Sequence, residues 1–151
     1  MSRTVYILNG PNLNRLGVRE PAIYGTDTLA AIRERCEARA ATHGLTVEFR
    51  QSNFEGALIE SVHEACDRGA AGLIINPAGY SFSSVALVDA LKMFDGPKME
   101  VHLSNIHARD PMYHHSLVSK VATAVIAGLG AEGYLVAVDA VAARIPQGVT
   151  A

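Results

Sequence analysis

The chain has 151 residues, 49% of them hydrophobic, and a formal net charge of -2 at pH 7. A chain of this length buries roughly 70% of its unfolded surface, so we expect a single domain over residues 1–151. The balanced charge gives no basic stripe for nucleic acid, and no apolar run reaches the roughly 20 residues that a membrane helix needs. The first residues lack the features of a signal peptide, which predicts a cytoplasmic protein whose partner is a small molecule or another copy of the chain.

Short apolar runs alternate with helical segments along the chain. The runs predict five strands, at residues 4–9, 46–51, 72–76, 99–103 and 121–127. Apolar spacing and capping residues predict helices that start after Asp27 or Thr28, near Phe54, after Ser81, Ser83 or Ser84, and at Ala131. We expect these helices to end before Gly44, at Arg68, at about Met93 and at about Arg144. Residues 10–25 and 104–119 are expected to be loops.

This alternation predicts a flavodoxin-like α/β fold, a three-layer sandwich with a five-stranded parallel sheet, because parallel strands need right-handed crossovers that cover both faces. Ligands in such sheets bind outside the carboxyl ends of the strands. Polar residues follow the predicted strands at those ends, namely Asn9, Asn12, Asn53, Asn76, His102, Ser104 and Asn105. We expect one crevice to collect all of them.

The loop after the first strand carries Arg19 and Tyr24 five residues apart. A connection of this length is uncommon in a compact domain unless it serves as a lid or a binding loop. A guanidinium beside a phenol favours the phenolate, so we interpret Tyr24 as a general base.

Glu100 and His102 form the second part of the predicted site, because side chains two residues apart on a strand point to the same face. A carboxylate beside an imidazole fixes its tautomer and supports its charged form, which makes His102 a proton donor. A core histidine satisfied by a neighbouring strand is the alternative for His102 alone. A base, an acid and several amides, with neither nucleophile nor cofactor, indicate elimination or isomerisation beside a carbonyl.

Two glycine-rich segments could indicate nucleotide binding, but each lacks part of the motif that such a site needs. The stretch from Gly128 to Gly133 matches the dinucleotide fingerprint, but that motif needs a further strand with an acidic residue about 20 positions on, and none is expected here. We interpret these glycines as a tight turn that allows close helix packing. The stretch from Gly10 to Gly17 lacks the Lys-Ser/Thr of a phosphate loop.

The histidines and cysteines do not predict a metal site. The histidines lack the spacing of known ligand sets, and we interpret His114 and His115 as part of an exposed loop. Cys36 and Cys66 fall on apolar helix faces and are expected to be reduced core residues. We therefore expect no metal and no other cofactor.

Many short motifs between about Val5 and Val138 occur in a fixed order. They are Ile7-Leu8-Asn9-Gly10-Pro11-Asn12-Leu13-Asn14, Arg19-Glu20-Pro21, Tyr24-Gly25, Gln51-Ser52-Asn53, Glu55-Gly56, Asn76-Pro77, Ser84-Val85-Ala86-Leu87, Asp89-Ala90-Leu91, Glu100-Val101-His102-Leu103-Ser104-Asn105 and Gly128-Leu129-Gly130 with Gly133-Tyr134. Together they strongly resemble the type II 3-dehydroquinate dehydratases. The resemblance implies a flavodoxin-like fold, a cofactor-free dehydration of 3-dehydroquinate to 3-dehydroshikimate in the shikimate or quinate pathway, and a dodecamer built from four trimers.

The resemblance also implies catalytic roles for the matching residues. Tyr24 would take a proton from the carbon beside the ketone, and Arg19 would favour its phenolate. Asn12 would hold a water that stabilises the enolate. His102 would protonate the departing hydroxyl, with Glu100 orienting it.

Four further residues are implied to bind substrate. Asn76 and the backbone amides of Leu103 and Ser104 would hold the substrate carboxylate, and Asp89 would reach a neighbouring subunit's site across the trimer. This agrees with the interpretation drawn from the residues alone, because an enolate forming in a closed site needs fixed donors more than it needs a metal.

The chain departs from the usual family motifs in three segments, each of which loses a basic side chain. Phe82 replaces the histidine of Thr-His-Thr, Val88 replaces the arginine before Asp89, and Tyr113 replaces the last arginine of Arg-Glu-Glu-Phe-Arg, whose first arginine is kept as Arg109. In the family that histidine and that last arginine bind hydroxyls on the substrate ring. We therefore expect the chemistry to be kept and recognition to be altered, with the Tyr113 hydroxyl or Arg109 as possible replacement donors.

Three functions stay open at this point. The first is an ordinary 3-dehydroquinate dehydratase with drifted binding residues, and this is the activity we expect. The second is a dehydratase of the same mechanism that acts on a related cyclic hydroxy-ketone acid. The third is a non-catalytic binding or scaffold protein, and the retained acid and base argue against it.

Overall fold

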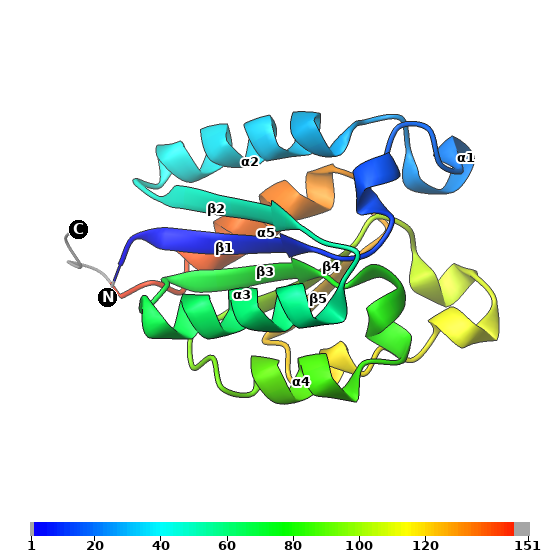
Figure 1. Ribbon diagram of the computed structural model, residues 1–151. Helices are drawn as coiled ribbons and strands as arrows, with labels where there is room; N and C mark the ends of the chain where they lie inside the picture. The colour runs from blue at the N-terminus through cyan, green and yellow to red at the C-terminus, as the bar shows by residue number, and fades with distance from the viewer. Residues whose placement is uncertain (1, 147–151) are drawn as a thin grey trace.

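The computed structural model describes residues 2–146, which form a parallel sheet between two layers of helices (Figure 1). The strands are β1 (Thr4–Asn9), β2 (Thr46–Gln51), β3 (Gly72–Asn76), β4 (Lys98–His102) and β5 (Ala124–Ala127), in the spatial order β2-β1-β3-β4-β5. The predicted flavodoxin-like fold with five parallel strands is confirmed. Residues 1 and 147–151, the ends of the expected single domain, lie outside the described residues.

Two pairs of helices cover the two faces of the sheet (Figure 1). Helices α2 (Leu29–Thr42) and α5 (Glu132–Ala142) pack together on one face, and α3 (Glu55–Asp67) and α4 (Val85–Leu91) pack on the other. β1 supplies alternate side chains to both cores, with Val5 and Ile7 on the α2 and α5 side and Tyr6 and Leu8 on the α3 and α4 side. Burial on both faces explains why this strand is a nearly continuous apolar run in the sequence.

The strand order places a crevice at the carboxyl ends of β1 and β3. The chain leaves β1 towards β2 on one side and returns to β3 on the other, so the connections after β1 and β3 diverge at that point. Gly10 follows β1 there, and its amide donates to the Asn76 carbonyl over 2.8 Å. A Cβ at position 10 would lie 2.4 Å from the Pro77 carbonyl oxygen, so only glycine lets the two connections approach this closely.

The predicted strand bounds are confirmed for β1, β2 and β3, but not for the last two strands. β4 begins and ends one residue earlier than expected. Val121 was expected to begin β5, but its amide donates to the Val118 carbonyl and closes the 3-10 helix η5 (Val118–Lys120). The strand begins only at Ala124 because the preceding backbone groups are already paired in that turn.

Two of the predicted caps are confirmed. Thr28 accepts a hydrogen bond from the Ala31 amide over 3.1 Å at the start of α2. Ser84 accepts from the Leu87 amide over 3.0 Å at the start of α4, so it is the cap among the three serines considered. Ser81 instead lies in the 3-10 helix η2 (Ala78–Phe82), and α4 ends at Leu91, two residues earlier than expected.

The two predicted loops contain short helices. The first holds η1 (Leu13–Arg15) and α1 (Pro21–Tyr24), and the second holds η3 (Ile106–Ala108) and η4 (Pro111–Tyr113). Proline at the first position of α1 and of η4 fixes the backbone in a helical conformation without losing a needed donor. These turns give the loops a fixed shape at the edge of the crevice.

The two cysteines are both free, as expected, and both contact the cores, Cys36 as a buried member and Cys66 at the edge. Cys36 is buried, and burial raises the pKa of its thiol to about 12, whereas Cys66 is half-buried. Within residues 2–146, none of the helices combines the length and the apolarity required to cross a lipid bilayer.

Candidate active site

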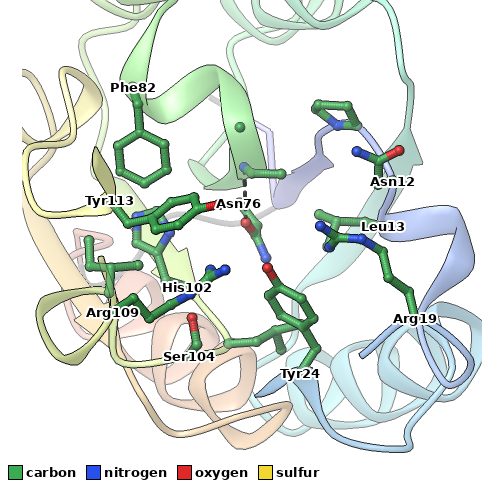
Figure 2. Close-up of a pocket in the computed structure, with 15 residues that line it drawn as sticks. Asn12, Leu13, Arg19, Tyr24, Asn76, Phe82, His102, Ser104, Arg109 and Tyr113 are labelled. Atoms are coloured by element: carbon green, nitrogen blue, oxygen red, sulfur yellow. Dashed lines mark hydrogen bonds between the residues drawn. The ribbon is translucent and has the colours of Figure 1, made fainter. Parts of the chain in front are cut away.

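A cavity of about 150 Å³ opens at the carboxyl ends of the strands, a size that admits a single six-membered ring (Figure 2). It is lined by Pro11, Asn12, Leu13, Arg19, Tyr24, Asn76, Ala78, Gly79, Phe82, His102, Leu103, Ser104, Ile106, Arg109 and Tyr113. Two residues assigned to the site from the sequence, Asp89 and Glu100, are absent from this lining. The lining includes two arginines and a histidine but no carboxylate, so the cavity suits an anionic ligand.

Tyr24 lies between two arginines (Figure 2). Arg19 places its guanidinium carbon 4.8 Å from the centre of the Tyr24 ring, and Arg109 places its own 5.3 Å from the same centre. Arg19 also forms an ion pair with Glu20 over 3.5 Å. The sequence anticipated one arginine beside Tyr24, and the structure brings a second from a segment 85 residues further along the chain. The Tyr24 ring is thus flanked by a guanidinium on two sides.

His102 is held by a carboxylate, as the strand alternation predicted. Its Nε2 is in hydrogen-bond contact with Glu100, which is fully buried beneath it. Ser119 donates a second hydrogen bond to Glu100 over 2.6 Å. Burial alone raises the pKa of Glu100, but the hydrogen bonds from His102 and Ser119 outweigh burial and hold that pKa below its usual value. Glu100 therefore stays a carboxylate and positions His102 without lining the cavity.

Asn76 is fixed in the cavity by a buried hydrogen-bonded chain. Its side-chain amide donates to the Tyr134 hydroxyl over 2.9 Å, and Tyr134 donates to the Asn9 oxygen over 2.7 Å. Burial raises the pKa of Tyr134 well above its ordinary value, so the hydroxyl stays neutral and available as a donor. The motif list included Tyr134, but its support of Asn76 was missed. A tyrosine on the apolar face of the last helix was the available signal, because a buried tyrosine hydroxyl usually finds a partner.

The expectation that one crevice collects every polar residue after the strands was wrong for three of them. Asn9 is buried behind the cavity, where it bonds the Arg50 carbonyl as well as Tyr134. Asn53 accepts from the Asn12 backbone amide over 2.9 Å and so supports the turn that presents Asn12. Asn105 instead caps η3 by accepting from the His107 amide.

Phe82 and Tyr113 form an aromatic wall on the side of the cavity opposite Asn12 (Figure 2). Their ring centres lie 5.4 Å apart in an edge-on arrangement, and the Phe82 ring stacks 6.4 Å from that of His102. Arg109 lies on the other side of Tyr113, with its guanidinium carbon 3.9 Å from the ring centre. The wall and Arg109 thus extend from the candidate acid to the candidate base.

The position of Asp89 leaves its predicted role in a neighbouring subunit open, whereas the interpretation of His114 as part of an exposed loop was wrong. Asp89 is exposed on α4 and pairs with Lys92 over 3.5 Å, so within one subunit it does not reach the cavity. His114, interpreted as part of an exposed loop, is half-buried and its Nε2 bonds the Arg109 carbonyl over 2.6 Å.

The glycines after β5 form a turn that holds the end of β4. The Gly128 amide donates to the His102 carbonyl over 3.2 Å, and the Gly130 amide donates to the Leu103 carbonyl over 2.9 Å. A Cβ at position 128, where φ is +92°, would lie 3.2 Å from that of Asn105. Because these amides are already paired, the turn positions His102 and Leu103 and does not offer donors to a pyrophosphate.

Among residues 2–146, no group of three or more His, Cys, Asp or Glu is arranged to hold a metal ion. A phenol flanked by arginines, facing a histidine held by a carboxylate, is a pair of groups for acid–base catalysis. On this parallel α/β fold, such a site is typical of an enzyme that uses acid–base catalysis on a small anionic substrate.

Comparison with known proteins identifies the family. Residues 3–142 match the family described as dehydroquinase class II. The 3-dehydroquinate dehydratase of Chelativorans sp. (strain BNC1) is 55% identical over 146 residues, covering 96% of this chain and 100% of that protein, and the one from Streptomyces coelicolor is 55% identical over 145 residues, covering 95% and 92%. The crystal structure of type II dehydroquinase from Propionibacterium acnes superposes with a TM-score of 0.90 at 44% identity, covering 95% of this chain and 98% of that one. The chain therefore belongs to the class II dehydroquinase family, and the resemblance noted in the sequence is confirmed.

Proposed function

We propose that this chain is a 3-dehydroquinate dehydratase, a hydro-lyase that converts 3-dehydroquinate to 3-dehydroshikimate without a cofactor. The relatives that carry the name of this activity are about half identical to the chain over nearly its full length. The observation that carries the proposal is the placement of Tyr24, between two arginines, in the same small cavity as the carboxylate-held His102.

In the proposed reaction the Tyr24 phenolate removes a proton from the carbon beside the ketone. The electrons of that C–H bond form the carbon–carbon double bond of an enolate, which a water held by Asn12 stabilises. When the enolate collapses back to the ketone, the C–O bond on the next carbon breaks and His102 protonates the departing hydroxyl. Because Nε2 of His102 is bound to Glu100, Nδ1 is the nitrogen that carries this proton. Water and an unsaturated ketone are the products.

Binding of the substrate carboxylate is assigned to Asn76 and to the backbone amides of Leu103 and Ser104. One hydrogen of the Asn76 amide is used by Tyr134, which leaves the other for the ligand. The cationic lining of the cavity supports a carboxylate at this position.

A dehydratase of the same mechanism for a ring with fewer hydroxyls is the second candidate. The aromatic wall favours it, because Phe82 stands at the cavity with an apolar ring that offers no hydrogen-bond donor. A buried substrate hydroxyl without a partner costs about 1–3 kcal/mol, so a less hydroxylated ring would bind such a wall better.

We also propose a homo-oligomer, up to the dodecamer that the family resemblance implies. Exposed apolar side chains on several elements support it, and Val18, Phe54, Val85 and Met112 are each more than 60% exposed in one subunit. In an assembly, Asp89 would complete a neighbouring subunit's site. Size-exclusion chromatography with light scattering tests this, and a monomer at micromolar concentration would contradict it. The cytoplasmic location expected from the sequence stays a prediction.

The deciding experiment is a steady-state assay of the purified protein with 3-dehydroquinate, followed by the same assay with cyclic keto acids that lack one ring hydroxyl. Formation of the conjugated ketone is followed by its ultraviolet absorbance. Turnover of 3-dehydroquinate, lost in Tyr24→Phe, supports the first candidate. Turnover of the less hydroxylated rings alone supports the second, and no turnover of any of them contradicts both.

A further inference from the structure

Arg109 is held mainly by aromatic rings. Its guanidinium carbon lies 3.9 Å from the centre of the Tyr113 ring and 5.3 Å from that of Tyr24. No ion pair of Arg109 with a carboxylate occurs within residues 2–146, although most other arginines there have one. With no acidic partner among these residues, the Arg109 side chain depends on packing against the rings to hold its position.

The backbone around Arg109 forms a turn that returns Tyr113 to it. The Tyr113 amide donates to the Asp110 carbonyl over 2.9 Å, which closes η4. His114, the next residue, bonds the Arg109 carbonyl over 2.6 Å. Pro111 at the first position of η4 restricts the backbone within the turn. The turn therefore fixes the Tyr113 ring relative to the base of the Arg109 side chain.

The outer edge of the turn is fixed by Phe82, which packs edge-on against Tyr113 with ring centres 5.4 Å apart. The result is a continuous stack of Phe82, Tyr113, Arg109 and Tyr24, visible along the left and lower side of the cavity (Figure 2). Its members come from three segments of the chain, because Arg109 and Tyr113 share one turn, and its last member is the candidate base.

We propose that Tyr113 is a positioning residue: its ring face holds the Arg109 guanidinium beside the Tyr24 ring, where the positive charge supports Tyr24 as the base. The ring performs this role and the hydroxyl is dispensable. The inference rests on the proposed function for the role of Tyr24 as base, but the contact itself can be tested without any substrate.

Other charged groups around Tyr24 do not replace Arg109. Arg19 lies on the other side of the ring and is partly neutralised by Glu20, and His102 faces Tyr24 across the cavity. A separate surface groove behind the Tyr24 ring is lined by further charged residues, which are Asp27, Arg35 and Glu132. Asp27 pairs with Arg35 over 3.8 Å, so this groove adds no free positive charge.

The test compares Tyr113→Phe, which keeps the ring, with Tyr113→Leu, which removes it. A cation–π contact in a partly desolvated site accounts for about a 2-fold to 30-fold effect, so we expect Tyr113→Leu to lower kcat within that range. We also expect its kcat to need a higher pH, and Tyr113→Phe to retain the wild-type kcat and pH profile. Met112→Leu, a change at an exposed position in the same turn, serves as the matched control.

A double-mutant cycle then tests whether Tyr113 acts through Arg109. In an Arg109→Ala background, Tyr113→Leu should have no further effect on kcat. Additive effects of the two changes, or equal damage from Tyr113→Phe and Tyr113→Leu, would overturn the proposal. If Tyr113 instead bound a substrate hydroxyl, both single variants would raise KM and leave the pH profile unchanged.

A spectroscopic titration separates this proposal from the proposed function. Tyrosinate absorbance is followed against pH in each protein, with the matching Tyr24→Phe variant as the blank, so that only Tyr24 is seen. We expect Tyr24 to ionise at higher pH in Tyr113→Leu than in Tyr113→Phe. Identical titrations contradict the positioning role even if 3-dehydroquinate is turned over, whereas a clear difference supports it even if 3-dehydroquinate is not the substrate.

Discussion

At the scale of single residues, the candidate site depends on the charged side chains that lie beside the Tyr24 phenol and the His102 imidazole. Tyr24 has arginines on two sides, and His102 has a buried carboxylate behind it. A phenol with positively charged neighbours and an imidazole with a negatively charged neighbour thus lie in one cavity.

Tyr24→Phe and Arg19→Ala should each lower kcat for 3-dehydroquinate by a factor of about 10² or more, because loss of a catalytic base or of its activating charge costs at least that much. Circular dichroism should remain unchanged, since Arg19 is exposed on the loop after β1 and Tyr24 is only partly buried at the edge of one core. Near-normal turnover by Tyr24→Phe would show that another group is the base.

The aromatic wall gives a prediction about recognition. Restoring donors with Phe82→His and Tyr113→Arg should lower KM for 3-dehydroquinate by a factor of about 10², because each recovered hydrogen bond to a buried hydroxyl is worth about 1–3 kcal/mol. KM is the measured quantity here, since the change at Tyr113 also removes the ring that holds Arg109 and so affects kcat separately. A wild-type KM in the ordinary enzyme range that the double variant does not improve would mean that Phe82 and Tyr113 are neutral drift.

At the scale of elements, β4 illustrates how one strand serves both the core and the site. Met99 and Val101 point into the core beneath α5, while Glu100 and His102 point to the other face. The two-residue repeat of a strand therefore supplies the contact between carboxylate and imidazole without any loop. This arrangement buries the charge of Glu100, and hydrogen bonds from Ser119 and His102 compensate for the loss of solvent.

Glu100→Gln should therefore affect activity, through the position of His102, and should also change how Tm depends on pH. The pKa of Glu100 is lowered in the folded state, so its contribution to stability is present above the unfolded value of about 4.3 and is lost as pH falls through the folded value. The wild-type advantage in Tm over Glu100→Gln should shrink on acidification from about pH 7 to about pH 3. A difference in Tm that does not vary with pH would contradict this linkage.

At the scale of the whole molecule, the fold gathers every member of the site at one edge of the sheet. The cavity residues come from the connections after β1, β3 and β4, and the glycine turn after β5 holds the end of β4 from behind. The candidate acid, the candidate base and the candidate amide donor thus line one cavity of a single chain, whereas Asp89 lies outside it.

Chelation should have no effect on activity, because the proposed chemistry uses only protein side chains and a water. Incubation with EDTA, removal of the chelator and assay with 3-dehydroquinate should give the untreated kcat and KM. Loss of activity that added zinc restores would require a metal-dependent mechanism instead.

The sequence by itself determined the order and kind of the five strands and the four longest helices, and part of the site, but it missed α1 and the 3-10 helices of the two long loops. Alternating apolar runs, caps such as Thr28 and the strand pair Glu100 and His102 are local patterns, since each depends on residues within about one helical turn or one strand. Local patterns also placed Tyr24 and Arg19 on one loop. They could not place the start of β5, where a turn at Val118 took the backbone groups that the strand needed.

Only the tertiary structure decided how distant side chains support the site. Tyr134 reaches Asn9 across 125 positions in the sequence, and Arg109 reaches Tyr24 from a different loop. Such contacts depend on how α5 and the loops pack against the ends of the strands, and no periodicity in the sequence encodes that packing. Tyr113 is the clearest case, because its residue type suggested a lost hydrogen-bond donor and its position in the fold places its ring face against a guanidinium.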